Sequence, residues 1–124
     1  MEPFIVSVDF DGTIAKNDWP NIDKLRFLAK YVLNKLREWN CILILNTCRE
    51  GLYLEQARKF LVTNGIFFDY YNENSDRKIQ EYGDCRKIGA DLYIDDKNFG
   101  YWNWLFVLIY MFFKIKVRGL FVGR

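Results

Sequence analysis

The sequence contains no histidine, and this absence excludes several kinds of active site. Ser-His-Asp triads, histidine-ligated zinc sites and phosphohistidine chemistry all need an imidazole ring. The three cysteines, Cys41, Cys48 and Cys85, form no CxxC pair, and their odd number argues against a disulfide framework. Neither Cys48 nor Cys85 has the arginine six positions on that cysteine-dependent phosphatases need. The chain also lacks G-x-x-x-x-G-K and G-x-G-x-x-G loops, which disfavours P-loop nucleotide hydrolysis and dinucleotide binding.

Long hydrophobic runs and clustered charges are scarce as well. The apolar run at 104–113 has ten residues, fewer than the ~20 needed to span a bilayer. Lysine and arginine are scattered and the net charge is only +2, so no dedicated nucleic-acid-binding stripe is expected. The N-terminus lacks the basic residues of a secretory signal, and we therefore expect a cytoplasmic protein.

The composition is that of a globular protein, with 51% hydrophobic and 27% charged residues in 124. We expect one domain over residues 1–124. Apolar runs predict strands at 4–8, 41–45, 66–71 and 92–94. Helical spacing predicts a helix capped by Asn21, a second ending at Gly65, a third over 75–82 and a C-terminal apolar helix at about 102–116. The alternation, with no hairpin signal, predicts an α/β, three-layer Rossmann-like fold with a central parallel sheet and helices on both faces.

Two acidic pairs follow predicted strands. Asp9 and Asp11 lie in the segment DFDGT, directly after the first strand, and Asp95 and Asp96 follow the last one. The C-terminal ends of parallel strands form one edge, and ligands of such sheets bind there. Carboxylates brought together repel one another by roughly 4 kcal/mol per pair at ~4 Å and an effective dielectric of ~20. A hard cation such as Mg²⁺, which prefers carboxylates, waters and a phosphate oxygen, would explain the arrangement.

DFDGT, Thr47 after the strand LILNT, a lysine and the final IDD occur in this order. In this pattern the chain resembles the haloacid dehalogenase superfamily, over residues 4 to 97. It is similar to small bacterial and phage members with a TxRE motif, here Thr47 to Glu50, and an RK-x-x-AD-x-x-IDD ending, here Arg86 to Asp96.

The resemblance implies a magnesium-dependent phosphatase that works through an aspartyl-phosphate. Asp9 would be the nucleophile and Asp11 the general acid and base. Thr47 and a lysine would stabilise the transferred phosphoryl group. The implied substrate-binding residues are Gly12, Thr13, Thr47, Cys48 and Arg49, and the implied Mg²⁺ ligands are Asp9, Asp11 (through its carbonyl), Asp95 and Asp96.

Several alternatives stay open from the residues alone. Lys87, eight positions before Asp95, is favoured as the catalytic lysine over Lys78. Arg49 either reaches the substrate or is a solvated arginine that opens the second helix. The spacing leaves no room for a cap domain, since the 33 residues between Thr13 and Thr47 are expected to form one loop and one helix.

The substrate would be a small-molecule or polynucleotide-end phosphate ester. The rival function is a catalytically silent module that binds magnesium and phosphate, or a protein partner. The C-terminal helix is apolar all round, which predicts a homo-oligomer. The basic residues Lys114, Lys116 and Arg118 leave a helix on an anionic membrane surface as the alternative.

Overall fold

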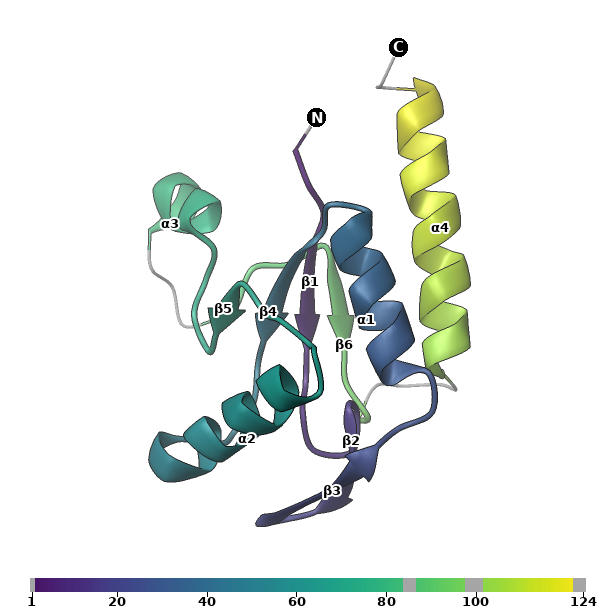
Figure 1. Cartoon of the computed structure of the whole chain (residues 1–124). Helices are drawn as coiled ribbons and strands as arrows, with labels where there is room; N and C mark the ends of the chain where they lie inside the picture. Colours follow the sequence, from purple (N-terminus) through teal and green to yellow (C-terminus); the bar gives the residue numbers. More distant parts are fainter. Residues whose placement is uncertain (1, 84–86, 98–101, 122–124) are drawn as a thin grey trace.

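The central sheet of the computed structural model has four parallel strands in the order β5-β4-β1-β6 (Figure 1). The structure describes residues 2–83, 87–97 and 102–121. The strands are β1 (Ile5–Val8), β4 (Ile42–Leu45), β5 (Tyr70–Tyr71) and β6 (Leu92–Ile94). The helices are α1 (Ala29–Glu38), α2 (Gly51–Thr63), α3 (Asp76–Tyr82) and α4 (Trp104–Phe121). The prediction of an α/β chain with a parallel central sheet is confirmed.

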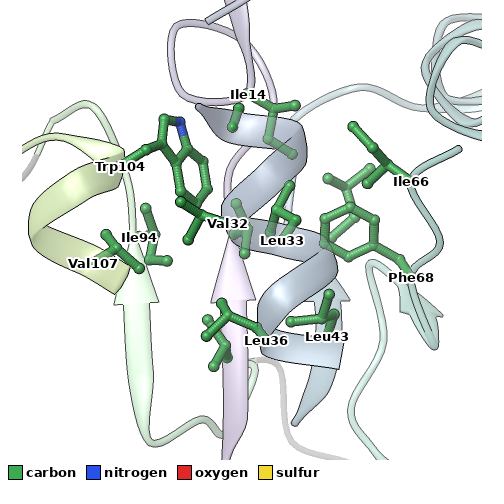
Figure 2. Close-up of a cluster of buried hydrophobic side chains, with 14 of the residues drawn as sticks. Ile14, Val32, Leu33, Leu36, Leu43, Ile66, Phe68, Ile94, Trp104 and Val107 are labelled. Atoms are coloured by element: carbon green, nitrogen blue, oxygen red, sulfur yellow. The ribbon is translucent and has the colours of Figure 1, made fainter. Parts of the chain in front are cut away.

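The larger hydrophobic core lies between one face of the sheet and the helices α1, α2 and α4 (Figure 2). Side chains alternate across a strand, so Val6 and Val8 of β1 enter this core. Four fully buried residues of α1 belong to the same core, and Trp104 and Val107 of α4 close one side (Figure 2). Burying each large aliphatic side chain contributes roughly 1.5–3 kcal/mol, which gives the sheet a rigid backing.

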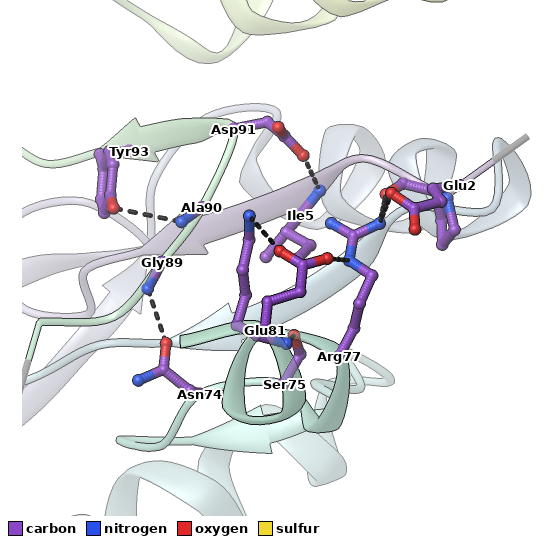
Figure 3. A network of polar contacts seen from close by, with 12 residues as sticks. Glu2, Ile5, Asn74, Ser75, Arg77, Glu81, Gly89, Ala90, Asp91 and Tyr93 are labelled. Carbon is purple, nitrogen blue, oxygen red and sulfur yellow. Dashed lines mark hydrogen bonds and ion pairs between the residues drawn. The ribbon is translucent and has the colours of Figure 1, made fainter. Parts of the chain in front are cut away.

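The opposite face of the sheet carries a smaller cluster formed by Ile5, Ile44 and Ile88. The chain before β6 is fastened there by hydrogen bonds to side chains (Figure 3). Gly89 N–H donates to Asn74 Oδ1 at 2.6 Å, and Ile5 N–H donates to Asp91 Oδ2 at 2.8 Å. These bonds hold the chain in place just before β6.

Residues 15–25 form a β-hairpin that the sequence analysis missed, made of β2 (Ala15–Asp18) and β3 (Asn21–Leu25). The predicted helix start at Asn21 is wrong, because α1 begins only at Ala29. Residues 16–18 are exposed, so β2 shows no apolar alternation, and the spacing of Ile22 and Leu25 suits a helix as well. The expectation of one loop and one helix before Thr47 is therefore wrong too.

Two other boundaries differ from the prediction. The third strand is limited to Tyr70–Tyr71, because Ile66 and Phe68 turn into the core instead of pairing. The last helix runs to Phe121 rather than to about 116. The other helix ends agree with prediction: Gly65 follows α2 with a φ of 75°, and Gly83 ends α3 with a φ of 78°.

Helix α4 turns one side to the core and leaves many apolar side chains uncovered. Trp104, Val107 and Met111 are buried. The exposed residues are Leu105, Phe106, Ile109, Tyr110, Phe112, Phe113 and Val117. Within the described ranges, no helix combines the length and apolar character needed to cross a membrane. Self-association through α4 stays a prediction.

Candidate functional site

The C-terminal ends of β1, β4 and β6 lie at one edge of the sheet, and this edge faces the hairpin (Figure 1). From β1 the chain adds β4 and β5 on one side and then β6 on the other, so the strand order reverses between β1 and β6. Ligands of open parallel sheets bind at such a switch point. Asp9 and Asp95 follow the two strands that flank it, and Thr47 follows β4.

A cleft of about 460 Å³ opens at this edge. It is lined by Asp9, Asp11, Asn17, Trp19, Thr47, Cys48, Arg49, Asp95, Asp96 and Lys97. Most of the predicted site residues are thus brought together, from loops that are distant in the sequence. The hairpin supplies Asn17 and Trp19, so it forms one wall of the cleft.

Three carboxylates form the centre of the site. One oxygen each of Asp9, Asp95 and Asp96 lies within 4.8 Å of the others. Burial, followed by the charge of Asp95, raises the pKa of Asp9 to about 7. Burial, followed by a hydrogen bond with Asp95, also raises the pKa of Asp96. Three acidic groups gathered in this way could hold a metal ion, which would relieve their repulsion.

This crowding predicts an unusual pH dependence for the metal-free protein. The folded-state pKa of Asp9 is about 7 against an ordinary value of 3.8, so between these values the folded form holds a proton that the unfolded form has lost. In chelator, the free energy of unfolding is therefore expected to fall as pH rises from about 4 to 7, by about 1–2 kcal/mol after solvent screening. Urea unfolding across this range measures it.

The matched comparison is between Asp9→Asn and Asp23→Asn, which removes an exposed carboxylate of the hairpin. Asp9→Asn should flatten the pH dependence, and Asp23→Asn should leave it as in the wild type. A wild-type stability that rises steadily over the same range would contradict the carboxylate crowding.

Gly12 and Thr13 contact the carboxylates and shape the loop that follows Asp9. Gly12 has a φ of +83°, and a Cβ built there would lie 2.2 Å from Asp96 Oδ2. Thr13 is fully buried, and its hydroxyl accepts the N–H of Asp96 at 2.9 Å and donates to Asp9 Oδ2 at 3.4 Å. In this arrangement both residues position the acids, and Gly12 N–H is already bonded to Ala15 O.

Gly12→Ala is expected to lower the free energy of unfolding by about 2–4 kcal/mol, because the methyl group displaces Asp96 and the backbone is strained. Gly51→Ala is the matched control, since Gly51 has a φ of +52° but nothing within 4 Å of its Cβ position. Chemical denaturation of both variants separates the clash from the strain. Equal losses would mean that the approach to Asp96 is unimportant.

Arg49 and Asp11 form a second group beside the three carboxylates. Arg49 Nε and Nη2 donate to the two oxygens of Asp11, both at 2.8 Å, and Nη2 also reaches Asn21 O at 3.2 Å. Arg49 is fully buried, so the interpretation of it as a solvated residue is wrong. Its guanidinium carbon lies over the rings of Phe10 and Trp19, 5.3 and 4.8 Å from their centres. Asp11 therefore faces Arg49 rather than the three other acids.

Thr47 is held by the loop that follows β5. Its N–H donates to Asn72 Oδ1 at 2.7 Å, and Asn72 Nδ2 donates to Arg49 O at 3.2 Å. The Thr47 hydroxyl accepts the N–H of Arg49 at 3.2 Å, which leaves its own proton available to a ligand. Cys48, the next residue, is exposed and lines the cleft. No sequence pattern pointed to Asn72, whose left-handed φ of 55° is a feature of the folded chain.

The lysine that lines the cleft differs from the two that were considered as the catalytic lysine. Lys87 is exposed and its Nζ lies 5.4 Å from the centre of the Tyr93 ring, while Lys78 pairs with Glu81 at 3.7 Å on α3. Among the residues described, Lys97 is the lysine that lines the cleft. Lys97 directly follows IDD, so its position next to the acids could have been predicted from the sequence.

A solved structure of similar fold is the conserved protein coded by a locus from Bacteroides thetaiotaomicron. The two share 32% sequence identity, with a TM-score of 0.82, over 91% of this chain and 93% of that chain. The chain belongs to the same family as this protein. The likeness extends over the fold as a whole rather than over one motif. No family model matches the chain, and no curated protein matches it.

Proposed function

We propose that this chain is a magnesium-dependent phosphomonoester hydrolase that works through an aspartyl-phosphate on Asp9. The observation that carries the proposal is the position of Asp9 at the switch point of the sheet, within 4.8 Å of Asp95 and Asp96. Thr47, from the neighbouring strand, lines the same cleft. The fold we propose is the capless haloacid dehalogenase type, with the hairpin β2–β3 as the cover over one side of the cleft.

The donor set of the cleft fits Mg²⁺. Three carboxylates offer hard oxygen ligands, and burial, followed by the neighbouring Asp95, raises the pKa values of Asp9 and Asp96, an effect that a bound cation would oppose. Asp9, Asp95 and Asp96 would hold the ion, together with the carbonyl of Asp11. When bound, it would polarise the phosphoryl group and keep Asp9 ionised.

The chain's own residues would divide the reaction into two displacements. A carboxylate oxygen of Asp9 attacks phosphorus, the ester P–O bond breaks, and the leaving oxygen takes a proton from Asp11. Water then attacks the phosphoryl group, Asp11 accepts its proton, and the bond to Asp9 breaks to give inorganic phosphate. The Thr47 hydroxyl donates to the phosphoryl oxygens, and Lys97 is a candidate, beside Lys87, for the cation that balances their charge.

A second candidate function is the silent module that binds magnesium and phosphate without turnover. Two observations favour it: both oxygens of Asp11 are engaged by Arg49, and neither Lys87 nor Lys78 is among the residues that line the cleft. The intact nucleophile Asp9 favours the enzyme.

Turnover of an aryl phosphate in Mg²⁺ separates the two functions, with Asp9→Asn as the negative control and Asp23→Asn as the matched neutral one. Hydrolysis that Asp9→Asn lacks supports the enzyme, whereas phosphate binding without hydrolysis supports the module. A panel of nucleotides, sugar phosphates and 3′- or 5′-phosphorylated oligonucleotides then identifies the substrate class.

A further inference from the structure

Arg49 is a buried cation with spare hydrogen-bonding capacity at the edge of the cleft. Its side chain is fully buried, yet the residue contributes to the cleft lining. Nε and Nη2 are used by Asp11 and Asn21, while Nη1 is buried and has no hydrogen-bond partner among the described residues. Leaving a donor of a charged group unsatisfied in a buried place is costly. A donor of this kind is suited to an incoming acceptor.

The chemistry of the guanidinium indicates what that acceptor is. Its planar fork matches carboxylate and phosphate oxygens equally well. The guanidinium carbon lies over the rings of Phe10 and Trp19, 5.3 and 4.8 Å from their centres, and these cation–π contacts use none of its N–H donors. The group can therefore change hydrogen-bond partners while the two aromatic contacts persist.

The pairing with Arg49 also restricts Asp11. The proposed function needs its carboxylate at the leaving oxygen, but Arg49 holds both of its oxygens at 2.8 Å. A tetrahedral phosphoryl dianion in the cleft would compete for the same donors. Its arrival would weaken the Arg49–Asp11 pair at the moment when Asp11 is needed.

We propose that Arg49 exchanges partners when substrate binds. Its guanidinium releases an oxygen of Asp11 and donates to a phosphoryl oxygen, so that one step binds the anion and frees Asp11 for proton transfer. Arg49 is then a substrate-binding residue that also positions Asp11. This inference rests on the proposed function for the identity of the ligand, and its test needs no turnover.

The test is binding of inorganic phosphate, measured by isothermal titration calorimetry with and without Mg²⁺. Asp11→Asn removes the ionic partner of Arg49, so phosphate is expected to bind about tenfold more tightly than to the wild type. Arg49→Lys keeps the charge but loses the fork, and is expected to bind about tenfold more weakly. Asp23→Asn, on the exposed hairpin, should bind as the wild type does.

The double variant Asp11→Asn/Arg49→Lys distinguishes exchange from a general change in charge. If Arg49 is the group released, the gain from Asp11→Asn disappears in the double variant. A gain that persists there, or no gain in Asp11→Asn, would overturn the proposal.

If Arg49→Lys does not fold, the Nε–H NMR signal of Arg49 in the wild type gives the answer. It should shift on addition of phosphate, and an unchanged signal in a protein that binds phosphate refutes the exchange. A protein that shows the exchange but no turnover would contradict the proposed function alone. One that hydrolyses aryl phosphates without the exchange would contradict this inference alone.

Discussion

Asp9→Asn is expected to abolish phosphatase activity, with a loss of about 10⁴-fold or more in kcat. The substitution keeps the shape of the side chain but removes the oxygen nucleophile, and no other carboxylate of the cleft follows β1 directly. Asp11→Asn leaves the nucleophile in place and removes the proton shuttle, typically worth 10²–10⁴-fold. Steady-state hydrolysis of an aryl phosphate measures both variants.

The two variants should also differ in how they bind beryllium fluoride, which imitates an aspartyl-phosphate. The wild type and Asp11→Asn should bind it, and Asp9→Asn should not. Retention of even a tenth of the wild-type activity by Asp9→Asn would mean that the nucleophile lies elsewhere. Thermal unfolding of each variant in Mg²⁺ shows whether a lost activity comes from a lost fold.

Removal of Mg²⁺ is expected to lower turnover by at least about 10³-fold, and Ca²⁺ is expected not to restore it. Burial, followed by the charge of Asp95, raises the pKa of Asp9 to about 7, so without a cation Asp9 is partly protonated and a poor nucleophile near neutral pH. Calcium has longer and looser coordination, which would misplace the phosphoryl group relative to Asp9. Titration of the chelated protein with each metal, followed by hydrolysis rates, measures the effect.

Asp95→Asn is the companion variant for the metal requirement. One ligand is lost, so half-maximal activity should need about tenfold or more Mg²⁺. Asp91→Asn is a poor control, because Asp91 accepts the N–H of Ile5 in the central sheet. Asp23→Asn changes the same charge on the exposed hairpin, where Asp23 accepts the N–H of its neighbour Lys24. Full activity in chelator, or equal support by Ca²⁺, would contradict the magnesium assignment.

The parts of the fold that could be predicted are those that a short stretch of sequence determines by itself. The runs at 4–8 and 41–45 are buried on both faces of a sheet, so their apolar character alone indicates a strand. Gly65 and Gly83 have left-handed φ values that other residues rarely adopt, and they correctly indicated the ends of α2 and α3.

The hairpin could not be found in this way. Lys16, Asn17 and Asp18 point to solvent, and their strand is defined by pairing with β3 rather than by burial. As a result, the contribution of Asn17 and Trp19 to the cleft was also missed. Local patterns are weak guides where a strand has no apolar face.

The residues of the candidate site also divide into those that the sequence predicts and those that depend on tertiary packing. Asp9, Thr47 and Asp95 were assigned to one edge because each follows a strand, and parallel strands end together. The pair between Arg49 and Asp11 joins residues 38 positions apart, and no sequence pattern distinguishes it from a solvated arginine. That arginine is buried through tertiary contacts: its guanidinium lies over the rings of Phe10 and Trp19, and the Trp19 ring lies 5.0 Å from that of Tyr53 on α2.

Covalent capture of the intermediate shows whether Asp9 is phosphorylated during turnover. The wild-type protein is mixed with an aryl phosphate in Mg²⁺, quenched in acid within one turnover and digested, and the peptides are analysed by mass spectrometry. A labile acyl phosphate, close to one per chain, is expected on the peptide that contains Asp9, and none in Asp9→Asn. Hydrolysis by the wild type with no phosphoryl group on that peptide, or with one on another residue, would mean that Asp9 is not the nucleophile.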